Sequence, residues 1–143
     1  MKVIIMVLIL AAGCSQKVKE QSPGQSYSDL LTNGKWVLRS VIINPPINGG
    51  DTDFYAMYPD CVRDDTLFFN KDGVSTLDKG VLKCTSADSQ QAFFKWKLKG
   101  DNLIMDGKSA KIKNLDDHHL YIIYSQDLNS ITHNLSATYK NSR

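Results

Sequence analysis

Apolar and polar residues alternate along most of the chain after about residue 35, which is the pattern of β-strands rather than helices. The clearest segment is 93–99, in which Phe94, Trp96 and Leu98 point one way and lysines point the other. A period of two with apolar residues on one side and lysine on the other is typical of a half-buried antiparallel strand. The same reasoning predicts eight strands, at residues 35–43, 65–70, 74–78, 93–99, 103–105, 109–113, 120–124 and 129–140.

The alternation also predicts which side chains share a face in the first and last strands. In the first strand, Trp36, Leu38 and Ile42 are expected on one face and Arg39 on the other. In the last strand, the residues expected on one side are Ile131, His133, Leu135 and Ala137.

Short strands that follow one another through tight turns favour an up-and-down antiparallel meander. Such a sheet exposes its edges unless it closes. The predicted fold is therefore all-β: an eight-stranded antiparallel up-and-down barrel, preceded by a short N-terminal helical turn at 29–31 with Ser26 or Ser28 as its N-cap. An open sandwich of two sheets is the alternative. The interior of such a barrel is either filled by side chains or just wide enough for a small ligand.

A hairpin bounded by Cys61 and Cys84 occupies the middle of the chain. Asp72-Gly73 is a strong two-residue turn signal, because a type I′ turn needs positive φ and Asp-Gly tolerates it. With those two residues at the tip, the continued strand register sets Cys61 opposite Cys84, close enough for a disulfide. A four-residue loop at 70–73 would place Leu82 opposite Cys61 instead.

The first residues have the pattern of an export signal. A basic start, an apolar run at 3–10 and small residues before Cys14 describe a secretory signal peptide. The run is too short for a permanent membrane span, which takes about 20 apolar residues. Its ending resembles the lipobox of bacterial lipoproteins, which implies cleavage before Cys14 and acylation of that residue; an ordinary signal peptide with a stray cysteine is the alternative. The predicted organisation is a signal peptide at 1–13, a polar flexible tether at 14–27 and a barrel domain at 28–143.

The number of cysteines fits this organisation. An exported chain with three cysteines needs a use for the odd thiol. Lipid on Cys14 leaves Cys61 and Cys84 to pair in an oxidising compartment, and two free buried cysteines are the alternative. The expected location is the outer membrane, which the protein would reach through its lipid anchor. Residues 15–20 are not acidic, so a periplasm-facing and a cell-surface position both stay open.

Charge and candidate chemistry argue against several functions. The chain has 17 basic and 15 acidic residues, without a basic cluster interleaved with aromatic residues, so nucleic acid is not an expected partner. The best metal candidate is the run 116–119, Asp-Asp-His-His, but adjacent strand residues face opposite ways, so we expect a solvated turn. We expect no metal and no cofactor. His133 has no nucleophile motif beside it, so we expect a monomeric binding protein rather than an enzyme.

Several motifs together resemble the lipocalin-like domain of small secreted bacterial lipoproteins. The resemblance covers about residues 30–140 and is carried by Leu30-Leu31, Gly34-Lys35-Trp36, the stretch 61–73, Lys83-Cys84 and Trp96-Lys97-Leu98. It implies a lipocalin-like barrel on an outer-membrane lipoprotein, but it does not indicate which ligand the barrel binds. The Gly34-x-Trp36 element is similar to the signature of true lipocalins, in which the tryptophan closes one end of the barrel, often under a basic side chain. Lys140 or Arg143 is the candidate for that side chain.

The predicted function is the binding of a small apolar ligand in the barrel or at its mouth, with residues 44–61 as a candidate lid. The expected ligand-binding residues are Trp36, Phe54, Tyr58, Phe68, Phe94, Trp96, Tyr124 and His133. Two competing interpretations are a solid core filled by the aromatic residues and a histidine that is hydrogen-bonded at a barrel end. The alternative function is a non-catalytic structural or interaction lipoprotein that contacts envelope proteins or polysaccharide through its loops.

Overall fold

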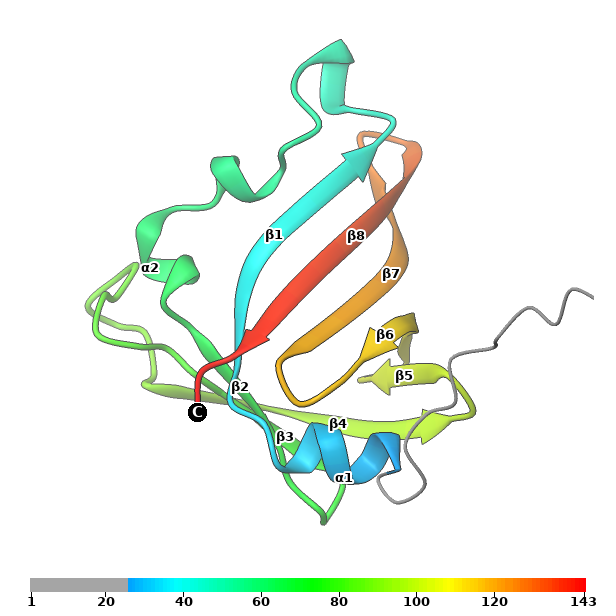
Figure 1. The fold of residues 1–143 in the computed structure, drawn as a ribbon. Coiled ribbons are helices and arrows are strands. Elements are labelled where there is room, and N and C mark those ends of the chain that lie inside the picture. The colour runs from blue at the N-terminus through cyan, green and yellow to red at the C-terminus, as the bar shows by residue number, and fades with distance from the viewer. Residues whose placement is uncertain (1–25) are drawn as a thin grey trace, which may run out of the picture.

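The computed structural model describes residues 26–143, which form a closed barrel of eight antiparallel strands (Figure 1). Each strand pairs with the next one in the chain, and β8 pairs with β1, so the predicted up-and-down barrel is confirmed. The strands are β1 (Trp36–Asn44), β2 (Thr66–Phe69), β3 (Val74–Asp78), β4 (Gln91–Lys99), β5 (Asn102–Met105), β6 (Lys108–Leu115), β7 (His119–Leu128) and β8 (Ile131–Asn141). The helical elements are α1 (Tyr27–Thr32), η1 (Ile47–Gly49), η2 (Tyr55–Met57) and α2 (Asp60–Arg63).

Part of the predicted organisation lies outside the described residues. This holds for the predicted signal peptide, for Cys14 and for the tether up to residue 25. Ser26 and Tyr27, at the end of the predicted tether, belong to α1 and its N-cap. From residue 26 onward, the structure contains no helix with the length and hydropathy needed to cross a bilayer.

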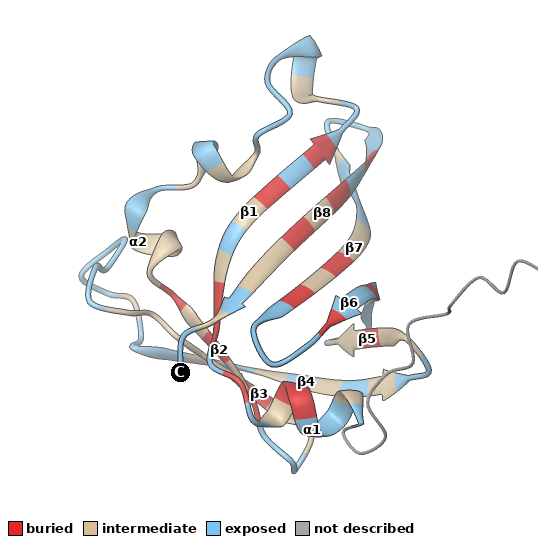
Figure 2. Ribbon diagram, in the orientation of Figure 1, coloured by how far each residue is buried: buried red, intermediate tan, exposed pale blue. Residues whose placement is uncertain are grey.

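One hydrophobic core fills the barrel between α1 and the middle of the long strands. Buried positions alternate with less buried ones over parts of β1, β7 and β8 (Figure 2), as inward and outward side chains of a strand should. On β4 the predicted faces are confirmed, because Phe94, Trp96 and Leu98 are half-buried while the intervening lysines are exposed. The most deeply buried apolar side chains are Trp36, Phe69, Leu31, Ile43, Leu103, Leu120, Leu135 and Val41.

A bulge in β1 overturns one predicted face. The β1–β8 register shifts between Leu38 and Ser40, which leaves Arg39 outside the ladder. One extra residue reverses the alternation beyond it. Val41 and Ile43 therefore point into the core, and Ile42, which we predicted on the face of Trp36, is 43% exposed.

The tip of the β2–β3 hairpin is also longer than predicted. Phe69 pairs with Ser75, and the N–H of Gly73 donates to the carbonyl of Asn70, so three residues rather than two form the loop. Gly73 has φ +82°, the left-handed conformation that completes a type I turn followed by a bulge. The predicted type I′ turn and its register are wrong by one residue, and the four-residue loop is excluded as well.

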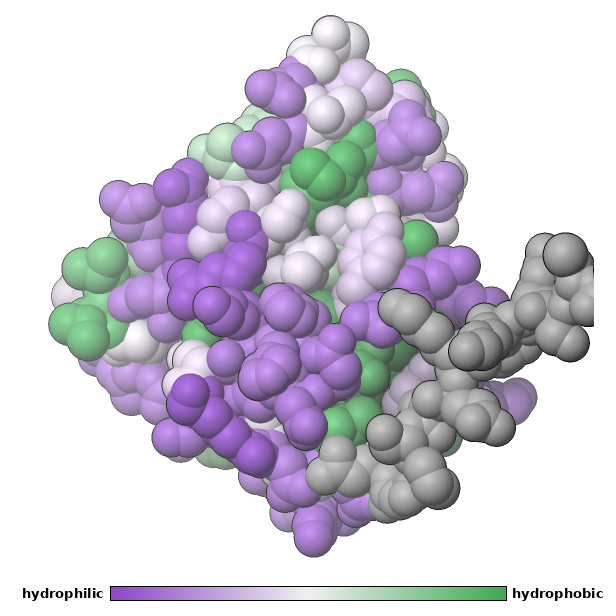
Figure 3. Space-filling view, in the orientation of Figure 1, coloured by the Kyte–Doolittle hydropathy of each residue, from purple (hydrophilic) through white to green (hydrophobic). Residues whose placement is uncertain are grey.

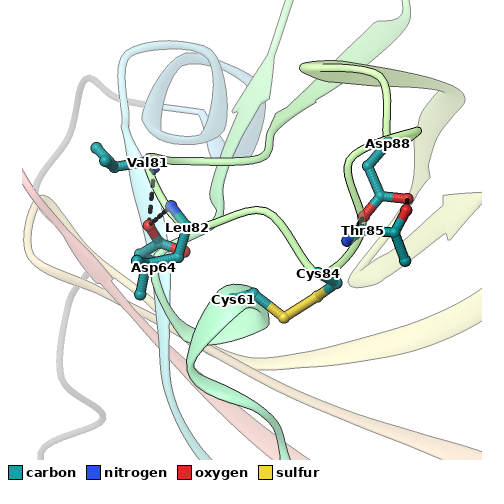
Figure 4. The surroundings of a disulfide bond; sticks show 7 residues. All are labelled: Cys61, Asp64, Val81, Leu82, Cys84, Thr85 and Asp88. Atoms are coloured by element: carbon teal, nitrogen blue, oxygen red, sulfur yellow. Dashed lines mark hydrogen bonds between the residues drawn. A yellow bond between two sulfur atoms is a disulfide. The ribbon is translucent and has the colours of Figure 1, made fainter.

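The disulfide is present although that register is wrong. Cys61 lies in α2 and Cys84 lies in the loop after β3, and their sulfur atoms are bonded, with Cα atoms 5.2 Å apart (Figure 4). Asp64 fixes the same loop, because its Oδ2 accepts hydrogen bonds from the N–H groups of Val81 and Leu82 at 2.8 and 3.0 Å. The disulfide and these two hydrogen bonds thus attach the loop after β3 to α2 and to the residue that follows it.

Helix α1 packs at the barrel end where β1 begins (Figure 1). Ser26 is its N-cap and forms a capping box with Asp29. Leu31 is fully buried against the core, and its carbonyl accepts a hydrogen bond of 3.0 Å from Trp36 Nε1. On β8, Asn141 is the strand partner of Trp36.

The Gly34-x-Trp36 pattern has a steric explanation in this end. A Cβ atom on Gly34 would lie 2.2 Å from Cε2 of the Trp36 ring, far inside any real contact distance. Glycine is therefore required by the fully buried indole next to it.

Candidate functional site

A cavity of about 740 Å³, partly open to solvent, lies between β4, β5, β6, β7 and β8. Its walls are mainly apolar and aromatic side chains, and polar groups lie at the β5–β6 turn and on the end of β7. The apolar and aromatic lining residues are Phe94, Leu103, Met105, Ala110, Tyr124 and Tyr139. The polar ones are Asp106, Lys108, Ser109, Ser125, Gln126 and Asp127. The arrangement suits an apolar molecule with its polar surface toward the rim.

A second, smaller cavity of about 200 Å³ lies between the first strands and the segment that precedes β2. Its lining residues are Trp36, Leu38, Tyr58, Val62, Asp65, Leu67, Leu77 and Tyr139. Tyr139 borders both cavities, so the two are neighbours.

The segment between β1 and α2 supplies one wall of the smaller cavity. It runs back along β1 (Figure 1), where the N–H of Ile43 donates to Thr52 and the N–H of Phe54 donates to Val41. β1 pairs with β2 only at Trp36 and Val37, so this segment covers the part of β1 that β2 does not reach. Tyr58, near the end of this segment, lines the smaller cavity and packs edge-on against Phe54, with ring centroids 5.3 Å apart.

Three tyrosines and one aspartate bring polar atoms to these cavities. Burial raises the pKa of Tyr124 to about 12 and also raises the pKa values of Tyr58 and Tyr139, so all three hydroxyls are protonated at neutral pH. Burial is the first cause of a raised pKa at Asp65, to which the charges of Asp64 and Asp78 add and which Lys79 opposes. The cavities therefore offer neutral hydroxyls along their length and a carboxyl group at one end.

The structure brings four of the eight predicted ligand-binding residues to a cavity wall. Phe94 and Tyr124 line the larger cavity, and Trp36 and Tyr58 line the smaller one. Phe54 instead supports Tyr58 from behind. Trp96 packs edge-on against Phe69 and donates its Nε1–H to the carbonyl of Asn70, which ties it to the hairpin tip.

The last two predicted residues lie elsewhere. Phe68 alternates with the buried Leu67 and Phe69, so its side chain is on the outer face of β2. His133 is 2% exposed, and its Nδ1 is hydrogen-bonded to the carbonyl of Pro45, which is the arrangement of a satisfied histidine at a barrel end. Neither residue lines the two cavities described here.

Sequence reasoning missed Tyr139 and Asp65, although the signal for both was present. Tyr139 continues the inward series of Leu135 and Ala137 on β8, and Asp65 lies just before β2, two positions before the inward-facing Leu67. A polar side chain at the inward position of an alternating strand is informative because burial of an unpaired polar group is costly.

The Asp-Asp-His-His run forms a turn. Asp116 Oδ1 accepts hydrogen bonds from the N–H groups of His118 and His119 at 2.8 and 2.7 Å, and these contacts contribute to lowering its pKa. Residues 26–143 contain no group of three or more His, Cys, Asp or Glu side chains placed to hold a metal ion.

Comparisons with known proteins give similarity in solved structures alone. No protein-family model matches the chain, and no curated protein matches it. A complex of bovine odorant-binding protein with undecanal is 16% identical, with a TM-score of 0.48, over 87% of this chain and 78% of that one. The odorant-binding protein from bovine nasal mucosa gives the same values, and its complex with a selenium-containing odorant is 14% identical with a TM-score of 0.47. Similarity at this level does not bear on what this chain binds.

Proposed function

We propose that the protein binds a small apolar molecule inside its barrel and is a lipid-anchored, lipocalin-like protein of the cell envelope. The observation that carries the binding proposal is the interior cavity of about 740 Å³ beside Phe94, Leu103 and Tyr124. Small-molecule sites usually measure about 300–1,000 Å³ and combine apolar walls with a few polar groups.

Filling the cavity should weaken binding. Ala110 lines the cavity opposite Leu103 on β5, so in Ala110→Trp the indole would occupy the ligand's volume. We expect the affinity for decanol, measured by calorimetry, to fall by about tenfold or more, because bound ligand and indole exclude each other. Lys97→Trp on the outer face of β4 is the matched control and should bind decanol like the unchanged protein. Equal affinity in the two tryptophan variants, or no binding of any apolar probe, would contradict the proposal.

The lipid anchor rests on the lipobox-like ending at Cys14 and on the disulfide, which leaves that cysteine as the odd thiol. We expect the full chain, expressed in a bacterial host with an alkyne-labelled fatty acid, to take up the label and to sediment with membranes. Cys14→Ala should lose both properties, because an acyl chain contributes membrane affinity of about 0.8 kcal/mol per buried CH₂ group. Ser15→Ala is the control, and label retained in Cys14→Ala would refute acylation at that site.

A second function, contact with envelope proteins or polysaccharide through loops, draws on two exposed apolar side chains. Val81 is 91% exposed and Leu82 is 50% exposed, on the loop that Asp64 and the disulfide hold. On the face shown in Figure 3, however, apolar residues occur in several separate places among polar ones rather than as one broad patch. A folded protein that fails to bind apolar probes would shift support to this second function.

A further inference from the structure

Asp65 has a carboxylate group that the fold leaves unused. The side chain is 8% exposed, and its Oδ1 is buried without a hydrogen-bond partner among residues 26–143. Asp64 also has one unpaired oxygen, but its other oxygen holds the 81–82 backbone. Buried acceptors are paired in the great majority of proteins, so an unpaired one facing a cavity indicates a donor that arrives with a ligand.

The surroundings of Asp65 fit an ammonium group. The smaller cavity that it lines is also bordered by Trp36, Tyr58 and Tyr139. Aromatic ring faces attract a cation, and a carboxylate accepts strong hydrogen bonds from N⁺–H donors. Lys79 is the basic residue whose charge reaches Asp65, yet the described part of the chain has no ion pair between them. A metal ion would need further donors, which residues 26–143 do not place there.

We propose that the ligand of this barrel is a long-chain amine, whose protonated nitrogen binds Asp65 and whose hydrocarbon chain extends past Tyr139 into the larger cavity. The proposal rests on the proposed function, because it adds a head-group site to the same barrel interior. Tyr139 borders both cavities and so marks the point where head and chain meet. The apolar walls at Leu103 and Met105 then take the chain.

The test compares three probes of equal chain length by calorimetry: decylamine, decanol and decanoate. The exported chain, residues 14–143 with Cys14→Ser, removes competition from attached lipid. We expect decylamine to bind at least tenfold more tightly than decanol, and decanoate to bind most weakly because its charge repels Asp65. In Asp65→Asn the preference for the amine should disappear while decanol binds within about twofold of the unchanged protein, since the two side chains have the same shape.

Controls separate this proposal from the one on which it rests. Asp101→Asn removes the same charge from a partly exposed residue that is paired with Lys111 and lines neither cavity, and it should keep the amine preference. Asp65→Ser gives a second variant, and decanol binding shows that each variant is folded. Equal binding of amine and alcohol, or an amine preference that survives in both Asp65 variants, would overturn the head-group site and leave the apolar site standing. Absence of binding by all three probes would overturn both.

Discussion

Replacing Trp36 with alanine should lower the free energy of unfolding by about 3–5 kcal/mol, the usual cost of removing a large buried aromatic side chain. The indole is completely buried where α1 meets the barrel, and its loss leaves a void among core residues. It also leaves the carbonyl of Leu31 without its donor. Urea denaturation followed by circular dichroism measures the change, because the backbone signal does not depend on the tryptophan.

A double-mutant cycle with Gly34 tests whether the glycine serves the tryptophan. Gly34→Ala alone should destabilise by about 1–3 kcal/mol, since the new methyl group overlaps the indole. Combined with Trp36→Leu, which keeps an apolar side chain but vacates that space, the same change should cost much less. An equal cost of Gly34→Ala in both backgrounds would show that the glycine is needed for another reason.

Removing the disulfide should cost about 3 kcal/mol, the chain-entropy value for a loop of this length, because the unfolded chain regains the freedom of the segment between Cys61 and Cys84. The double variant Cys61→Ser/Cys84→Ser should therefore unfold at a lower urea concentration than the oxidised protein. Both cysteines lie outside the strands, so the barrel itself should keep its circular dichroism spectrum.

Reduction provides the matched control for this prediction. Dithiothreitol should move the unfolding midpoint of the unchanged protein to that of the double variant and should leave the double variant unaffected. A reduced protein as stable as the oxidised one would mean that noncovalent contacts, such as the hydrogen bonds of Asp64, hold this end without the disulfide.

The architecture of the barrel could be predicted from sequence because it depends on a periodic signal. Phe94, Trp96 and Leu98 alternate with lysines, and each such strand needs only its own residues to show its inward face. The eight segments and the short turns between them then leave few topologies open.

The errors came from single extra residues, which periodicity does not reveal. The bulge at Arg39 places Val41 and Ile43 in the core instead of the predicted Ile42. The hairpin loop at 71–73 has one residue more than predicted, which shifts the β2–β3 register. The bulge shows only in the pairing of β1 with β8, and a glycine after aspartate suits a three-residue loop as well as a two-residue one. The predicted pairing of the two cysteines is confirmed, but the predicted reason for it is wrong. Cys61 and Cys84 lie in a helix and a loop rather than opposite each other on two paired strands.

The candidate site was only partly predictable for a different reason. All aromatic residues look alike as candidates in the sequence, so Phe68 was predicted together with Phe94 and Tyr124. Whether such a side chain lines a cavity depends on which face of its strand it occupies and on the neighbouring strands. Asp65 is informative only once its burial and missing partner are known.

The short junction between β1 and β2 has a consequence for how such a chain tolerates change in length. These strands pair only at Trp36 and Val37, and further along β1 the segment between them makes backbone hydrogen bonds to β1 through Thr52 and Phe54. That connection thus satisfies backbone groups of β1 that β2 does not reach. Shortening it would leave the N–H of Ile43 and the carbonyl of Val41 without these partners, so we expect this connection to tolerate deletions poorly.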